Sequence, residues 1–163
     1  MSVNKYLPHV FVLPEDDANR QLANGFLRDQ TLLIRKIQVL PEVGGWTQVL
    51  GRFQSDHVVG MDRYPHRFMV LLIDFDGNQE RLTEAKARIP LHLAERVFIL
   101  GVLSNPEALR QANRDSYEDI GRAMAKDCRE ETDETWGHKL LRHNAGELDR
   151  LREHVRPILF QTI

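Results

Sequence analysis

The sequence predicts an α/β protein with an open, mostly parallel, doubly wound sheet and helices at its C-terminal end. Two observations carry this prediction: short apolar runs alternate with segments of helical periodicity, and the run at 68–73 is apolar throughout, as in a strand covered on both faces. Parallel neighbours need crossover connections, which such helices supply. With 163 residues, 42% of them hydrophobic, we expect a single domain over 1–163 in which 113–163 form a mainly helical extension.

The first part of the chain contains two strand–helix units. The apolar run at 9–13 predicts the first strand, and a helix follows it to about residue 28, with Asp16 or Asp17 as its N-cap. Residues 37–40 predict the second strand. The glycine pair at 44–45 then opens a helix whose residues of one face recur at helical spacing, namely Trp46, Val49, Leu50, Phe53 and His57.

The alternation continues through the centre of the chain. The buried strand at 68–73 is followed by a predicted helix over 78–88 and a fourth strand over 96–103. Because the third strand has the longest unbroken apolar character, we expect it near the centre of the sheet.

Helices dominate the rest of the sequence. Asn105 followed by Pro106 predicts an N-cap and a short helix to about residue 112, and Ser116 begins another helix with an acidic capping box. A last amphipathic helix precedes the apolar residues 157–160, which we expect to dock back on the core. Its apolar face is formed by Leu148, Leu151 and Val155.

Acidic residues follow two of the predicted strands. Glu15, Asp16 and Asp17 come after the first strand, and Asp74 and Asp76 come after the third. If these strands are neighbours at the point where the winding reverses, Glu15, Asp74 and Asp76 meet in a crevice at the carboxyl edge, the usual ligand position in such sheets.

Three carboxylates brought together repel one another unless a hard divalent cation compensates for their charge. Mg²⁺ prefers oxygen ligands and needs only one or two protein carboxylates, so it is the predicted cofactor, with Mn²⁺ as a substitute. An alternative interpretation is purely structural. Asp and Gly are common where strands end, and Asp16 or Asp17 serves equally well as a helix cap.

A glutamate after the first strand and an Asp-x-Asp after a later hydrophobic strand resemble the Toprim domain of topoisomerases, primases and overcoming-lysogenization-defect nucleases. The matching positions are Glu15, Asp74 and Asp76, and the resemblance covers roughly residues 9–112. It implies that the aspartate pair binds magnesium, and that Glu15 acts in acid/base chemistry or helps to hold metal at a phosphodiester.

The same resemblance implies a small stand-alone protein near the nuclease branch. Asp16 stands where the family has glycine, and the sequence shows no tyrosine-bearing partner domain and no zinc module. In the nuclease branch a further acid and a lysine complete the site, and Glu107 and Lys139 are the candidates here. Glu107 is equally well explained as a first-turn acid of the helix that begins at Pro106.

A second resemblance is to response-regulator receiver domains, which have an acidic pair after strand one and a phosphoacceptor aspartate after strand three. Asp16, Asp17 and Asp74 match those positions. The second acid at Asp76, the lack of a clear fifth strand carrying lysine and the long second crossover depart from that pattern. This resemblance implies a signalling or interaction module with an acidic magnesium site and no hydrolytic activity.

Charge and cysteine content limit the partners. The net charge of -2 gives no global positive field, so we expect a protein partner or a homodimer to supply much of the grip on nucleic acid. Cys128 is the only cysteine, and no signal peptide or apolar run of membrane-spanning length occurs, which favours a cytoplasmic protein without a membrane partner. Trp46 is expected in the core, whereas Trp136, beside two basic pairs, is a candidate for stacking on bases.

Overall fold

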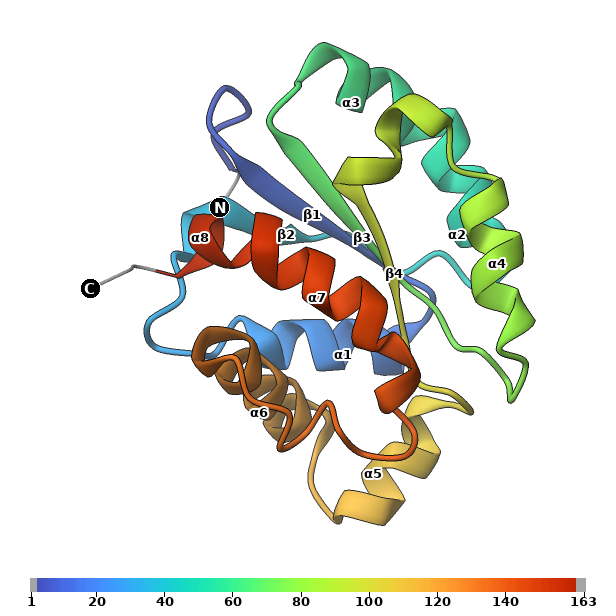
Figure 1. Cartoon of the computed structure of the whole chain (residues 1–163), viewed down its shortest axis with the longest axis vertical. Coiled ribbons are helices and arrows are strands. Elements are labelled where there is room, and N and C mark those ends of the chain that lie inside the picture. Colours follow the sequence, from blue (N-terminus) through green and yellow to red (C-terminus); the bar gives the residue numbers. More distant parts are fainter. Residues whose placement is uncertain (1–2, 161–163) are drawn as a thin grey trace.

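Four parallel strands form one open sheet in the order β2-β1-β3-β4 (Figure 1). The computed structural model describes residues 3–160. The strands are β1 (His9–Pro14), β2 (Ile37–Val39), β3 (Arg67–Leu72) and β4 (Val97–Leu100). The chain runs from β1 outward to β2 and then crosses back to place β3 on the other side of β1, so the winding reverses between β1 and β3. The predicted fold class is confirmed.

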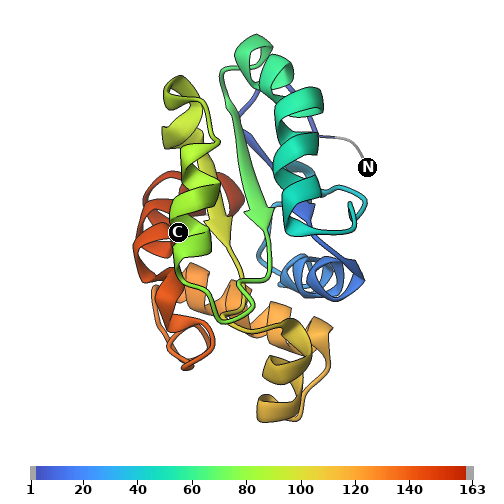
Figure 2. The same cartoon turned by 90° about the vertical axis from the view of Figure 1, so that its right-hand side faces the viewer.

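Helices cover both faces of the sheet, as Figures 1 and 2 show. One face carries α2 (Trp46–Arg52), α3 (Val58–Arg63) and α4 (Glu80–Ala87). The other carries α1 (Asp17–Phe26), α5 (Pro106–Asn113), α6 (Tyr117–Glu130), α7 (Ala145–His154) and α8 (Arg156–Leu159). Successive strand residues alternate between the two cores: Val10, Val12 and Val70 face the second group, and Phe11, Leu13 and Met69 face the first.

Three helices begin at the caps that the sequence predicts. The side chains of Asp16, Asn105 and Ser116 accept hydrogen bonds from backbone N–H groups three residues later, at the starts of α1, α5 and α6. The helix predicted after the glycine pair continues to Arg63, because a π-helical turn, Phe53–His57, joins α2 to α3 without a break.

Helices α1 and α6 pack unusually closely through two glycines. A Cβ atom added to Gly25 would lie 2.1 Å from the carbonyl oxygen of Glu118, and one added to Gly121 would lie 1.9 Å from that of Leu22. Any side chain at either position would therefore collide with the backbone of the facing helix. This contact fixes where α1 lies, and so where the residues at its start are held.

Side chains of the C-terminal region close the free edge of β4. The carboxylate of Glu147 accepts a hydrogen bond from the N–H of Ile99 at 2.9 Å, and the Asn144 amide bonds both the N–H and the carbonyl of Gly101 at 3.1 and 2.9 Å. The strand predicted over 96–103 is regular only over Val97–Leu100, although the N–H of Phe75 still donates to the carbonyl of Val102 at 3.1 Å beyond its end. Capping of this kind also prevents the edge from pairing with another chain.

The last described residues return to the core, as predicted. Leu159 and Phe160 are buried, and the carbonyl of Leu159 accepts a hydrogen bond from the N–H of Leu33 at 2.7 Å. Between residues 3 and 160, no helix combines the length and the apolar composition that crossing a lipid bilayer requires.

Candidate functional site

The loops after β1 and β3 lie side by side at the carboxyl edge of the sheet. Pro14 and Leu72 end the two strands and are register partners, and the N–H of Glu15 donates to the carbonyl of Leu72 across 2.9 Å. Glu15 therefore leaves the sheet beside the segment that leads to Asp74. This is the place where the winding reverses, and where open α/β sheets bind ligands.

Glu15 and Asp74 are in direct contact. The Oε2 atom of Glu15 accepts a hydrogen bond from the backbone N–H of Asp74 at 2.5 Å. Burial raises the pKa of both carboxyl groups, and the nearby charges of Asp16 and Asp76 raise them further; the pKa of Asp74 reaches about 7. Carboxyl groups whose pKa is raised by burial mark a place that favours a bound proton or cation.

The side-chain amide of Asn19, in the first turn of α1, bridges the two acidic loops. Its Nδ2 atom donates to Asp16 Oδ1 and to Asp74 Oδ1, both at 2.9 Å, and the side chain is fully buried. The hydrogen bond to Asp74 lowers the pKa of that carboxyl and so opposes the effect of burial. The sequence holds one signal for this role, since Asn19 lies three residues after the N-cap, where a side chain can reach back to the cap.

Arg81 of α4 brings a positive charge to the same edge. Its Nη1 atom donates to the carbonyl of Asp74 at 2.7 Å and to Asp76 Oδ2 at 3.0 Å, and its guanidinium lies 4.5 Å from the centre of the Trp46 ring. Trp46, expected in the core, is half-buried and forms one wall of the site. No motif in the sequence points to Arg81, although Asp74 and Asp76 lie only seven and five residues before it. Its contact with the Trp46 ring arises when α2 and α4 pack together.

The loop from Asp74 to Gly77 is held rigidly. The N–H groups of Phe75, Asp76 and Gly77 donate to the carbonyls of residues 102–104 at 2.6–3.1 Å, and the Phe75 ring is buried edge-on against His143. Asp76 and Gly77 have positive φ angles of 49° and 77°, which turn the chain away from the sheet. These amides are therefore occupied, and the loop offers its carboxylates rather than its N–H groups to a ligand.

Of the three acids expected to meet, two do so closely. The third, Asp76, has a side chain that is 61% exposed and paired with Arg81. Among residues 3–160, no group of three or more His, Cys, Asp or Glu side chains is arranged to hold a metal ion. The available donors are all carboxylate oxygens, which suit Mg²⁺, and this ion completes its shell with water and phosphate oxygens when a protein provides one or two carboxylates.

The remaining predicted residues lie outside these contacts. Glu107 is exposed in the first turn of α5, and Lys139 is exposed between α6 and α7; neither has a hydrogen bond or ion pair to the acidic loops in the part of the chain that is described. Trp136 is buried, and its indole N–H donates to the carbonyl of Met124 at 3.2 Å. Trp136 packs in the core with apolar residues of α6 and α7. The prediction that it stacks on bases is therefore wrong.

Cys128 is also buried in α6, and burial raises the pKa of its thiol to about 11, so it is not a nucleophile in the native protein. The chemistry available at the carboxyl edge is thus that of Glu15, Asp74 and Asp76 with Asn19 and Arg81 around them. Comparison of the chain with protein-family models, with curated proteins and with solved structures finds no match, so the role of the site has to follow from these residues.

Proposed function

We propose that the acidic loops bind Mg²⁺ and that the protein hydrolyses phosphodiester bonds in nucleic acid, as a Toprim-like nuclease or nuclease subunit. The observation that supports this most strongly is the contact between Glu15 and Asp74 at the switch point, where burial raises both pKa values. A buried acid pair of this kind gains stability from a hard cation. Mn²⁺ is expected to substitute for Mg²⁺.

Each acid then has a distinct task. Asp74 and Asp76 hold the metal, and Asp74 releases its proton when the metal binds. Glu15 takes a proton from the attacking water, a task for which a raised pKa is suited. A bound Mg²⁺ would supply Lewis-acid polarisation of a phosphoryl oxygen and would lower the pKa of the attacking water.

Arg81 is the proposed contact to the phosphate. Its guanidinium lies over the Trp46 ring and donates to Asp76 through Nη1, so a phosphate oxygen arriving at this edge competes for the same Nη1 atom. Glu107 and Lys139 remain predicted contributors. Since the net charge is only -2, a protein partner or a second copy of the chain is expected to supply most of the remaining grip on nucleic acid.

The test is to incubate the purified protein with nicked, supercoiled and single-stranded DNA and with RNA, in Mg²⁺ or Mn²⁺. We expect strand cleavage that Asp74→Asn abolishes. The matched control is Asp62→Asn, which removes an exposed aspartate of α3 that is paired with His92. Cleavage that survives in Asp74→Asn, or absence of both metal binding by calorimetry and cleavage in the wild type, would contradict the proposal.

A second candidate is a receiver-like signalling module in which Asp74 accepts a phosphoryl group. The strand order β2-β1-β3-β4 favours it, because flavodoxin-like sheets, the receiver fold among them, begin with this order and bind ligands at the β1/β3 switch point. The link from Asp16 through Asn19 to Asp74 is also compatible. Beryllofluoride with Mg²⁺ should then shift the NMR signals around Asp74 in the wild type and not in Asp74→Asn, with no cleavage of nucleic acid.

A further inference from the structure

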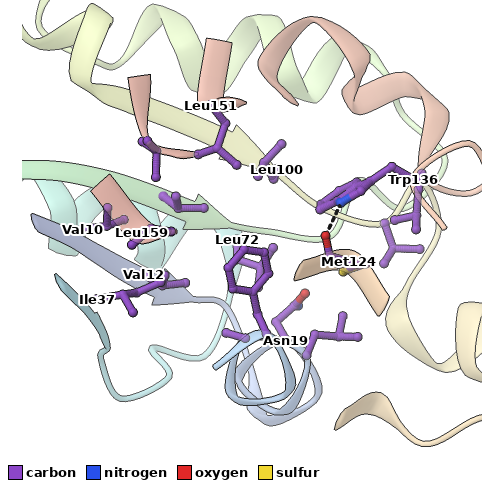
Figure 3. Close-up of a pocket in the computed structure, with 18 residues that line it drawn as sticks. Val10, Val12, Asn19, Ile37, Leu72, Leu100, Met124, Trp136, Leu151 and Leu159 are labelled. Atoms are coloured by element: carbon purple, nitrogen blue, oxygen red, sulfur yellow. Dashed lines mark hydrogen bonds between the residues drawn. The ribbon is translucent and has the colours of Figure 1, made fainter. Parts of the chain in front are cut away.

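A cavity lies on the side of the sheet opposite to α2 and α4, under helices α1, α6 and α7. Its volume is about 70 Å³, and Figure 3 shows its side chains converging from the sheet and from these helices. The walls are almost entirely apolar and include Val12, Leu72, Leu100, Trp136 and Leu151. One polar residue, Asn19, stands at one end.

The carbonyl oxygen of Asn19 faces this cavity. No hydrogen-bond donor within residues 3–160 reaches Oδ1, although the residue is fully buried, and Figure 3 shows the oxygen directed into the space below Leu72. The orientation of the amide is fixed by its other end, since Nδ2 donates to Asp16 and to Asp74. Exchanging the two atoms would place an acceptor against two carboxylate oxygens, which also only accept when ionised.

Water is a poor occupant of such a space. A buried water is held by two to four polar partners, and this cavity offers one, because the indole N–H of Trp136 is already bonded to Met124. One water needs roughly 10–15 Å³ of this kind of volume, so the cavity has room for about five non-hydrogen atoms. An apolar molecule with a single hydrogen-bond donor matches the apolar walls and gives Asn19 Oδ1 a partner.

We propose that the cavity is a binding site for a small apolar molecule that carries one hydroxyl or N–H donor, with the size of a four-carbon alcohol, and that this donor bonds to Oδ1 of Asn19. The site is separate from the proposed metal chemistry and does not depend on it. Because the same amide bridges Asp16 and Asp74, an occupant also holds Asn19 in the orientation that supports the acidic loops.

The test compares two isomers, 1-butanol and diethyl ether, which have the same five non-hydrogen atoms and differ in that only the alcohol can donate. Each is titrated into the metal-free, methyl-labelled protein, and binding is followed by NMR. We expect saturable shifts of the methyl groups of Leu100 and Leu151 and none at Val49 on the opposite face. The alcohol should bind about fivefold more tightly than the ether, the effect of one net hydrogen bond of about 1 kcal/mol.

Two variants locate the site. Ala23→Met fills the cavity and should abolish the shifts, whereas Asn24→Met, at the exposed neighbouring position of α1, should leave them unchanged. In Asn19→Leu the preference for the alcohol should disappear. If neither isomer gives saturable shifts, if both bind equally to the wild type, or if Ala23→Met binds like Asn24→Met, the proposal is overturned. The comparison of the two isomers uses the wild-type protein, so it tests the proposal even if Asn19→Leu does not fold.

Discussion

The Oε2 atom of Glu15 lies 2.5 Å from the backbone nitrogen of Asp74, so an acid from the first strand is fixed against the loop that follows the third. Burial is the main reason why the pKa of Asp74 rises from the usual 3.8 to about 7. A carboxyl whose pKa is higher in the folded chain than in the unfolded one favours folding while it is protonated. Its contribution is complete below about pH 4 and is lost as the pH rises towards 7.

Asp74→Asn should therefore change how stability depends on pH. Asparagine cannot ionise, so relative to the wild type the variant should gain on the order of 4 kcal/mol in free energy of unfolding between pH 4 and pH 8. Urea denaturation of both proteins across this range measures the difference, in which the titrations of other groups largely cancel. Parallel curves would show that Asp74 titrates normally in the folded protein.

Added Mg²⁺ should stabilise the wild type at pH 8. Binding to the folded state alone contributes about 2.7 kcal/mol when the free ion is at one hundred times its dissociation constant. The measurement is urea denaturation with MgCl₂ and with NaCl at equal ionic strength. Asp62→Asn should respond as the wild type does, and Asp74→Asn should not respond. An equal response of all three proteins would mean that the ion binds elsewhere.

Those features that depend on neighbouring residues in the sequence could be predicted. The caps at Asp16, Asn105 and Ser116 follow from local hydrogen-bonding chemistry, and the strands follow from their apolar runs. The meeting of Glu15 with Asp74 could also be predicted, because alternation of strands and helices implies a parallel sheet with a common carboxyl edge.

Features that arise from packing between distant segments could not be predicted. Arg81 bonds to Asp74 and Asp76, which lie seven and five residues before it, but its contact with the Trp46 ring arises only because α4 packs beside α2. The burial of Trp136 depends on how the C-terminal part of the chain docks, since its indole N–H bonds to the carbonyl of Met124 in α6. This burial is not visible in the spacing of nearby residues.

Glu147→Ala should be strongly destabilising. The carboxylate is 3% exposed, accepts from the N–H of Ile99 at 2.9 Å, and pairs with Arg150 at 3.0 Å and with Lys86. Removing it leaves the buried N–H of Ile99 without an acceptor, at a cost of about 1–3 kcal/mol, and also removes the ion pairs with Arg150 and Lys86. Urea denaturation measures the loss. Glu153→Ala, at an exposed position of the same helix, should change stability by less than about 0.5 kcal/mol.

The contact between α1 and α6 makes opposite predictions for two glycines. Gly121→Ala places a methyl group against the carbonyl of Leu22, which forces the helices apart and should cost at least about 1–3 kcal/mol. Gly146→Ala lies in α7 with open space around it and should instead stabilise the protein by about 0.5–1 kcal/mol, because alanine favours a helix. Denaturation midpoints of both variants, compared with that of the wild type, test these two predictions. If Gly121→Ala were also neutral or stabilising, the two helices would have to lie farther apart than the structure places them.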